Sequence, residues 1–401
     1  TTMVIPSYWM RERTEDARMT DAVYDHPTPL DDEGTLGRTL ESISTLNDKD
    51  FDLVIIAVSN AEDVEKRVEE RVARIIENSR VDVTVRLFSH SHLRRMHRIM
   101  DEAGVRRFVE LLSLRGYSNV RNLCLFLPHL LGSNIAVLID DDEVFEDPFF
   151  MSKAREFIGR KIGNRFTGAV AGYYLQPDGG WRLRETQKDQ GTAWDKVARM
   201  NEAFEKIIGT PPRLKETPFV FGGNMIVHRE IFTEIPFDPA ISRGEDIDYL
   251  INMRMFGHAF FLDNTLSIKH LPPLKPHPAW KKLREDLYRF IRERGKLRHQ
   301  EEVPGMVYVK AEELDPYPGA FLKDDLEEKI AEECTALAAK YKREGRENDA
   351  REALENIHIA QLEARTEENS FHRLIRTKEL WGEMMSFTYT DNIRKKLTSL
   401  L

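Results

Sequence analysis

The stretch from Asn134 to Asp142 reads NIAVLIDDD, an apolar run that ends in three adjacent carboxylates. A short apolar run with β-branched residues predicts a buried strand. Side chains two apart on a strand point the same way, so Asp140 and Asp142 can address one site. Three neighbouring carboxylates repel one another without a counter-ion, and hard cations prefer carboxylate oxygens. The stretch therefore predicts a Mg²⁺ or Mn²⁺ site, with a solvent-facing acidic turn as the alternative.

Strands and helices alternate on the N-terminal side of this stretch. Apolar runs predict strands at residues 1–5, 51–58 and 81–88, and helical spacing predicts helices at 35–46, 62–78 and 120–131. Such alternation is typical of βαβ units, so we expect an α/β fold, Rossmann-like, with a mostly parallel central sheet. In these sheets a ligand binds at the carboxyl ends of the strands. Pro6-Ser7-Tyr8, Ser59-Asn60 and the acidic run fall at such ends.

The second half of the chain changes character near residue 275. Before it, strands are expected at 167–175, 218–227 and 259–268. After it, charged helices are expected at 279–299, 320–345 and 347–367. We therefore expect an α/β domain over residues 1–275 and a helical C-terminal region over 276–401. The helical region could pack back on the domain or form a homo-oligomer.

Three further motifs offer chemistry, each with a plainer alternative. Glu245-Asp246, after Gly244, opens a predicted helix and could supply a base or merely complement the helix dipole. Gly222-Gly223-Asn224 interrupts an apolar run, which indicates a close backbone approach to a ligand or a plain bulge. His270 follows the last predicted strand and is either structural or a metal ligand.

A basic stretch spans residues 89–115. Its histidines match no zinc pattern, but its arginines could grip an anionic acceptor or form a solvated helix face. They are Arg94, Arg95, Arg98, Arg106, Arg107 and Arg115.

Composition sets outer bounds on function. The 401 residues carry a formal net charge of −9, which argues against nucleic-acid binding. Two cysteines make no disulfide framework, so we expect free thiols in a reducing compartment. The sequence holds no apolar run of the ~20 residues that a transmembrane segment needs. These features favour a cytoplasmic protein, and the basic helix expected at 280–298 leaves a peripheral contact with an anionic membrane open.

Taken in order, these motifs resemble the GT-A glycosyltransferases, especially family 2, over roughly residues 3–270. Pro6-Ser7-Tyr8 is similar to the family's nucleotide-contacting turn, and Arg121 to the Arg that opens the helix before the metal strand. Asp140 to Asp142 resembles the DXD motif. Gly222-Gly223-Asn224 is similar to the acceptor-side segment, and Glu245-Asp246 to the Glu-Asp pair that carries the catalytic base. Ser59-Asn60 departs from the Asp that the family often has there.

The resemblance implies a metal-dependent glycosyltransferase (a hexosyltransferase, EC 2.4) that transfers a sugar from a UDP- or GDP-sugar to a hydroxyl acceptor. It implies an inverting reaction with Asp246 as the base and Glu245 as the alternative. The implied metal ligands are Asp140, Asp142 and His270. The implied acceptor contacts are Gly222, Gly223 and Asn224. The implied donor contacts are Pro6, Ser7, Tyr8, Ser59, Asn60, Arg121, Asp140 and Asp141.

Three rival readings stay open at this point. The chain is also similar to retaining GT-A families that make glucosyl- or mannosyl-glycerates. A sugar-1-phosphate nucleotidyltransferase would open with a Gly-rich loop, which Pro6-Ser7-Tyr8-Trp9 lacks. A non-catalytic nucleotide- or sugar-binding scaffold would bind a donor without consuming it.

Overall fold

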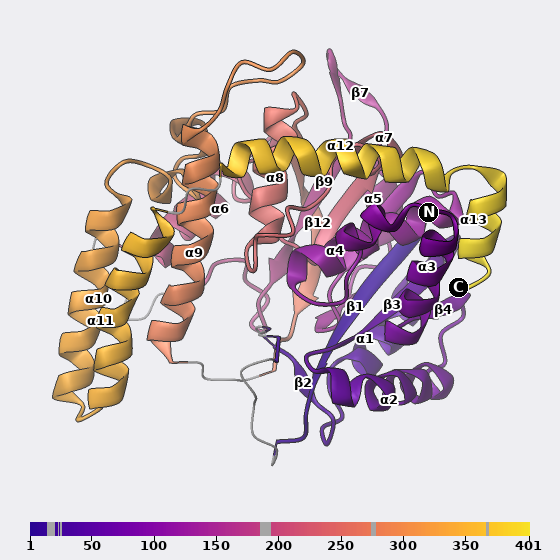
Figure 1. Cartoon of the computed structure of the whole chain (residues 1–401), viewed down its shortest axis with the longest axis horizontal. Helices are drawn as coiled ribbons and strands as arrows, with labels where there is room; N and C mark the ends of the chain where they lie inside the picture. The colour runs from indigo at the N-terminus through magenta and orange to yellow at the C-terminus, as the bar shows by residue number, and fades with distance from the viewer. Residues whose placement is uncertain (14–20, 23, 25, 185–193, 274–277, 366–368) are drawn as a thin grey trace.

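The structure is a computed structural model that describes residues 1–13, 21, 22, 24, 26–184, 194–273, 278–365 and 369–401. A mixed β-sheet forms its centre, and helices cover both faces (Figure 1). The strand order along the sheet is β10-β12-β9-β11-β5-β1-β3-β4, with β2 paired to β1 and β6 to β12. The main strands are β1 (Thr2–Met10), β3 (Asp52–Ser59), β4 (Val85–Phe88), β5 (Ile135–Ile139), β9 (Ala169–Leu175), β10 (Leu214–Glu216), β11 (Asn224–His228) and β12 (Phe260–His270). The two short strands that join its margins are β2 (Thr28–Pro29) and β6 (Glu143–Val144), and β7 (Lys161–Ile162) with β8 (Arg165–Phe166) forms a separate hairpin.

The N-terminal half of the sheet is parallel. β1 pairs in parallel with both β3 and β5, so Val4 lies between Val54 and Leu138. The other half is mixed, because β11 runs antiparallel to β5 and β9, while β12 runs parallel to β9. The predicted α/β class is confirmed, and the antiparallel β11 is the feature that the alternation of strands and helices did not predict.

Alternate residues of β1 enter two different hydrophobic cores. Val4 and Tyr8 face one core, while Met3, Ile5 and Trp9 face the other, as the period-2 geometry of a strand requires. The helices that cover the faces are α1 (Leu36–Ser42), α2 (Glu65–Asn78), α3 (His90–Glu102), α4 (Tyr117–Leu131), α5 (Phe150–Glu156), α6 (Lys196–Ile207), α7 (Arg229–Phe232) and α8 (Glu245–Met255).

Three predicted strand boundaries were wrong. The strand expected from residue 81 begins only at Val85, and the other two concern site motifs. β1 continues to Met10, because Pro6 through Trp9 keep pairing with β3, so Pro6-Ser7-Tyr8 lies inside the strand and not in a turn at its end. The strand expected from 218 begins only at Asn224. Before it, the Asn224 amide donates to the Phe221 carbonyl at 2.9 Å, which closes a turn around Gly222 and Gly223.

The C-terminal part is helical, as predicted, with α9 (Ala279–Arg298), α10 (Leu326–Arg343), α11 (Glu347–Glu363), α12 (Ser370–Thr388) and α13 (Asp391–Thr398). α10 and α11 form a hairpin against α9, and α12 crosses the molecule to bring α13 beside α3 and α4 (Figure 1). The predicted boundary near residue 275 lies outside the described residues, and the division into domains stays a prediction, as does homo-oligomerisation. Within the part of the chain that the structure describes, no helix is both long and apolar enough to cross a membrane.

A buried charge cluster ties α9 to α8. The Lys296 ammonium group is fully buried and pairs with the Asp248 carboxylate. It also donates to the Asn252 amide oxygen at 2.8 Å and lies 3.4 Å from Asp238. Asp238 has a second cation, Arg373 of α12, at 3.3 Å. Packing of the C-terminal helices therefore includes charges that are satisfied only when α8, α9 and α12 are assembled.

Candidate active site

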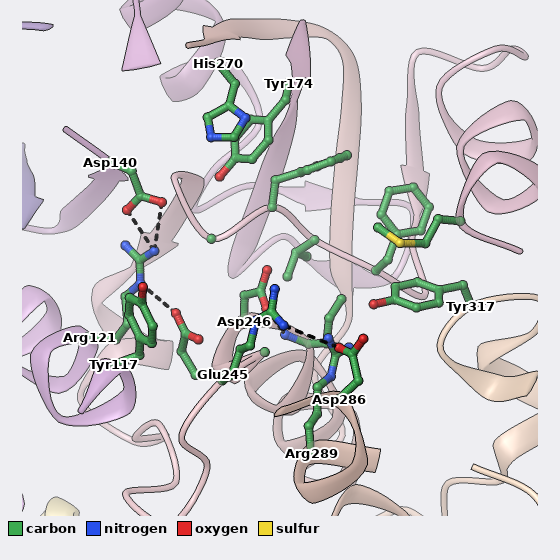
Figure 2. A pocket seen from close by; sticks show the side chains of 18 of the residues that line it. Tyr117, Arg121, Asp140, Tyr174, Glu245, Asp246, His270, Asp286, Arg289 and Tyr317 are labelled. Atoms are coloured by element: carbon green, nitrogen blue, oxygen red, sulfur yellow. Dashed lines mark hydrogen bonds and ion pairs between the residues drawn. The ribbon is translucent and has the colours of Figure 1, made fainter. Parts of the chain in front are cut away.

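A cavity of ≈ 300 Å³ lies at the carboxyl end of β5 and extends to the start of α8 and to α9 (Figure 2). Sequence-predicted residues from several separate motifs line it together. They are Arg121, Asp140, Asp142, Gly222, Glu245, Asp246 and His270. The sheet thus places this group of candidate residues at the strand ends, where α/β sheets bind ligands.

Asp142 and His270 contact each other at one end of this cavity. The His270 Nε2 atom lies 3.3 Å from Asp142 Oδ2. The backbone fixes this pair, because β12 ends at His270 beside β6, and the Leu271 amide donates to the Asp142 carbonyl at 2.9 Å. Burial acts to raise the pKa of the Asp142 carboxyl, but the hydrogen bond and charge of His270 outweigh it and hold that pKa below its usual value. Tyr174 stacks on the His270 ring with centroids 4.7 Å apart.

Arg121 of α4 connects the end of β5 to the start of α8. Its Nη2 atom lies 2.8 Å from Asp140 Oδ1, and its Nε donates to Glu245 Oε1 at 3.2 Å (Figure 2). The arginine side chain is only 4% exposed. Burial raises the pKa of Glu245 to about 7, against the opposing effect of Arg121 and with a smaller push from Asp246. Glu245 is therefore engaged as a partner of Arg121.

Asp246 is less buried than Glu245 and also faces the cavity. Gly244 precedes the pair with φ 71°, a left-handed conformation that suits glycine. A Cβ there would meet the Arg289 side chain at 2.3 Å, so the glycine also gives Arg289 its place against the helix start.

Gly222 and Gly223 are explained by close packing of site residues. A Cβ on Gly223 would lie 2.1 Å from Glu143 Oε1 and 2.7 Å from Asp140 Oδ2. A Cβ on Gly222 would lie 2.9 Å from Arg121 Nη2. The close approach that the sequence predicted exists, but the groups approached are the protein's own carboxylates and guanidinium. Only Gly222 of this segment lines the cavity.

Glu143 does not line the cavity but contacts Asp140, which does, and the sequence prediction did not include it. It is fully buried, its Oε2 accepts from the Asp140 amide at 3.0 Å, and its neighbour Tyr174 accepts from the Gly223 amide at 2.7 Å. Burial, with the charges of Asp140 and Asp142, raises its pKa well above the usual value. Its position directly after the acidic run was the available signal.

Several predicted donor contacts do not line the cavity. Asp141 points to the opposite face, where its Oδ2 accepts from Ser7 Oγ at 2.5 Å. Both side chains are buried there, and Pro6 lies in the paired part of β1. Asp140 to Asp142 follow β5 in a turn, in which the Glu143 amide donates to the Asp140 carbonyl at 3.4 Å. In this turn Asp141 faces Ser7, while Asp140 and Asp142 line the cavity. Pro6, Ser7 and Asp141 do not line this cavity, and their contacts with a donor stay a prediction.

The other predicted contacts lie apart from the cavity as well. Ser59 Oγ donates to the Ala61 carbonyl at 3.0 Å, and Asn60 is buried. The Asn224 side chain is fully buried and donates to the Leu266 carbonyl at 3.2 Å. Tyr8 is buried too, packed against Tyr117 with centroids 5.0 Å apart, and of the two rings it is Tyr117 that lines the cavity.

The far wall of the cavity comes from residues that the sequence prediction did not identify. Arg243 precedes α8, and Lys196 begins α6. Asp286 and Arg289 project from α9 (Figure 2). Arg243 stands directly before the Gly244-Glu245-Asp246 motif, but no role was predicted for it. Lys196, Asp286 and Arg289 are single charged residues in charged segments, so no motif marked them. In contrast, none of the six arginines predicted from the 89–115 stretch lines the cavity, and Arg94 pairs with Glu65 on the neighbouring helix.

The predicted metal site is only partly assembled by protein side chains. Among the described residues, no group of three or more His, Cys, Asp or Glu side chains could hold a metal ion alone. Asp142 and His270 are close enough to act together, while Asp140 is drawn to Arg121. A hard divalent cation that uses one or two side chains completes its shell with phosphate oxygens and water. The donor set fits a cation that binds together with a diphosphate.

Comparison with known proteins finds remote structural similarity. The chain matches no family model and no curated protein. A mannosyltransferase from Pyrobaculum calidifontis, PcManGT, solved in complex with GDP-Man and Mn²⁺, is 12% identical with a TM-score of 0.44, over 100% of this chain and 85% of that one. A mycobacterial protein is 17% identical with a TM-score of 0.36, over 72% and 73%. GalNAc-T7, solved with UDP, GalNAc and Mn²⁺, is 13% identical with a TM-score of 0.37, over 84% of this chain and 57% of that one. Similarities at this level assign no family.

Proposed function

We propose that this chain is a metal-dependent glycosyltransferase of the GT-A type, which transfers a sugar from a nucleoside diphosphate sugar to a hydroxyl acceptor. The observation that carries the proposal is the joint lining of one cavity by Asp142 with His270 and by Asp246. Such a cavity offers a place for a diphosphate-bound cation and, across from it, a carboxylate that can take a proton.

The chemistry assigns a role to each side of the cavity. The acceptor hydroxyl oxygen bonds to the anomeric carbon while the bond from that carbon to the diphosphate oxygen breaks, and Asp246 takes the hydroxyl proton. Pairing of Glu245 with Arg121 favours Asp246 over Glu245 as this base. A divalent cation held by Asp142 and His270 would supply charge neutralisation for the departing diphosphate. Arg121 positions Asp140 and Glu245 around the reacting groups.

The test measures binding and hydrolysis of a panel of UDP- and GDP-sugars with Mn²⁺, Mg²⁺ or EDTA. We expect one donor to bind only with metal, and Asp142→Ala to lose that binding. Asp324→Ala, at a surface carboxylate 95% exposed, is the matched control and should behave as the wild type. If no donor binds the wild type under any condition, the proposal is wrong.

A second measurement distinguishes a metal site that the nucleotide completes from one that binds the metal tightly without nucleotide. Among the described residues Asp142 and His270 are close together and no group of three metal ligands forms, so Mn²⁺ alone should bind weakly, and UDP or GDP should tighten its binding at least tenfold. By linkage the metal should tighten the nucleotide by the same factor. Equal Mn²⁺ affinity with and without nucleotide would contradict the proposed geometry.

Turnover separates the remaining alternatives. A non-catalytic scaffold would bind the nucleotide diphosphate and never consume the donor. A retaining enzyme of the glycosyl-glycerate type would give a product with the donor's anomeric configuration. Asp246 would then position the substrate and would not act as the base. The anomeric configuration of the product, measured by NMR, distinguishes a retaining from an inverting enzyme.

A further inference from the structure

The wall of the cavity opposite Asp142 and His270 carries three cations, which we call the cationic wall: Lys196, Arg243 and Arg289. Asp286 sits among them, with its Oδ2 2.5 Å from the Lys196 ammonium group and its Oδ1 3.8 Å from Arg243 Nη1. The Asp286 carboxylate therefore lies beside two of the three cations of the wall, Lys196 and Arg243.

Arg289 has donor capacity that the protein does not use. Its side chain is only 7% exposed, and its Nε donates to Glu293 Oε1 at 3.0 Å. Its Nη2 atom is buried without a hydrogen-bond partner among the described residues. A buried donor on a charged group costs free energy when it has no hydrogen-bond acceptor. A ligand that accepts this hydrogen bond removes that cost, which favours its binding.

The partner of Arg289 offsets its charge only in part. Glu293 is fully buried, and that burial raises its pKa to about 7 against the opposing charge of Arg289. Near neutral pH the Arg289–Glu293 pair therefore keeps part of its positive charge.

The cationic wall lies next to the proposed base. Arg289 packs against Gly244, the residue directly before the Glu245-Asp246 pair. Tyr317 lines the same end of the cavity, with the Arg289 guanidinium 5.7 Å from its ring centre. A group bound at Arg289 would hold the rest of its molecule beside Asp246 (Figure 2).

We propose that the cationic wall binds an anionic group, a carboxylate or a phosphate, of the acceptor. This rests on the transferase function proposed above and names the class of its acceptor. A guanidinium presents paired donors that match carboxylate or phosphate oxygens, and Lys196 adds a point charge. The acceptor's hydroxyl then lies within reach of Asp246, and its anion lies away from the diphosphate end of the cavity.

The experiment uses three probes that differ in one group: glycerate, glycerol 3-phosphate and neutral glycerol. Their binding to the full chain is measured by calorimetry and by the shift of the thermal midpoint, with Mn²⁺ and UDP or GDP present. We expect at least one anionic probe to bind and glycerol not to bind at the same concentration. Binding of glycerate alone identifies a carboxylate site, and binding of glycerol 3-phosphate alone identifies a phosphate site.

The variants are Arg289→Gln and its control Arg298→Gln, on the same helix but on the surface, where it pairs with Asp324. Arg289→Gln should weaken the anionic probe at least tenfold with nucleotide affinity within twofold of the wild type, and Arg298→Gln should change neither. Lys196→Gln provides the same test if Arg289→Gln does not fold.

Each failure has its own signature. Equal binding of glycerol, or an unchanged anion affinity in folded Arg289→Gln and Lys196→Gln, overturns the anion site. Loss of nucleotide binding with retained anion binding in these variants also overturns it, because the cations would then serve the diphosphate. Anion binding that depends on Arg289 in a protein that binds no nucleotide supports the anion site and refutes the transferase proposal.

Discussion

Replacing Lys296 with Met tests whether the C-terminal helices are held to α8 by the buried charge cluster. In the native structure the lysine satisfies Asp248, Asn252 and Asp238 at once. Met has a similar length without the charge, so the change removes the cation with little change in packing. Removing one partner of a buried ion pair costs about 3–5 kcal/mol, because it leaves an uncompensated charge.

The structure narrows this range to its lower end. Asp238 keeps Arg373 at 3.3 Å, so Asp248 is the carboxylate that loses its cation. We therefore expect a loss of about 3 kcal/mol. Unfolding entropy near ~2.1 cal/mol/K per residue over the 401 residues makes this a fall of about 4 °C in the thermal midpoint.

The assay is thermal unfolding of three variants beside the wild type. Lys282→Met, at an exposed lysine of the same helix, is the control and should change stability by less than ~0.5 kcal/mol. Lys296→Met combined with Asp248→Asn should recover much of the loss, because the second change removes the stranded charge. A double variant as unstable as the single one would refute the electrostatic reasoning.

Three other predictions concern the site and its surroundings. Burial raises the pKa of Glu293 to about 7, so between its usual value near 4.5 and that pH the folded state holds more protons, and wild-type stability falls as pH rises. Glu293→Gln lacks this loss, so its thermal midpoint relative to the wild type should rise from pH 5 to pH 8, and a flat difference would contradict the assignment. Asp246→Asn should lower turnover by ~10²–10⁴-fold with donor affinity unchanged, whereas Glu245→Gln, which keeps an oxygen for the arginine, should lower it less. If the two variants lose turnover equally, as measured by donor consumption, the assignment of Asp246 and not Glu245 as the base is wrong. Gly223→Ala forces a Cβ onto two site carboxylates and should abolish metal-dependent nucleotide binding, while Gly382→Ala, in the open middle of α12, should stabilise the protein by ~0.5–1 kcal/mol. Calorimetry with Mn²⁺ and nucleotide checks the first effect and thermal unfolding the second.

The parts of the site that sequence could predict are those that a local pattern encodes. The run ending in Asp140 to Asp142 is apolar and then acidic, which marks both a buried strand and its carboxyl end. The prediction that Asp140 and Asp142 share a side assumed an extended strand. β5 instead ends at Ile139, and both residues line the cavity from the turn that follows, with Asp141 directed to Ser7. The family resemblance implied donor contacts for Asp141 and Ser7, which do not line the cavity, and those contacts stay a prediction.

The parts that sequence could not predict depend on tertiary packing. Lys196, Arg243 and Arg289 are 47 and 46 residues apart along the chain, in segments where charged residues are common. Only the packing of α9 against α8 and α6 brings them to one wall. The predicted first strand was too short for a similar reason. Its last residues pair with β3 and are buried, but the sequence shows only a proline, which usually ends a strand.

The same helix that builds the cationic wall also supplies the buried Lys296, and this links stability to the acceptor side of the cavity. α9 presents Asp286 and Arg289 to the cavity, while Lys296, about two turns further on, fixes Asp248 of α8. Asp248 lies two residues after Asp246, so the anchor of α8 and the proposed base share the first turn of one helix. If the helical region served only for oligomerisation, the charges in the first turn of α8 would be balanced without any residue of α9. Here the charges of α8 are balanced by α9, so the catalytic proposal extends to the C-terminal helices and is not confined to the sheet that carries the acidic motif.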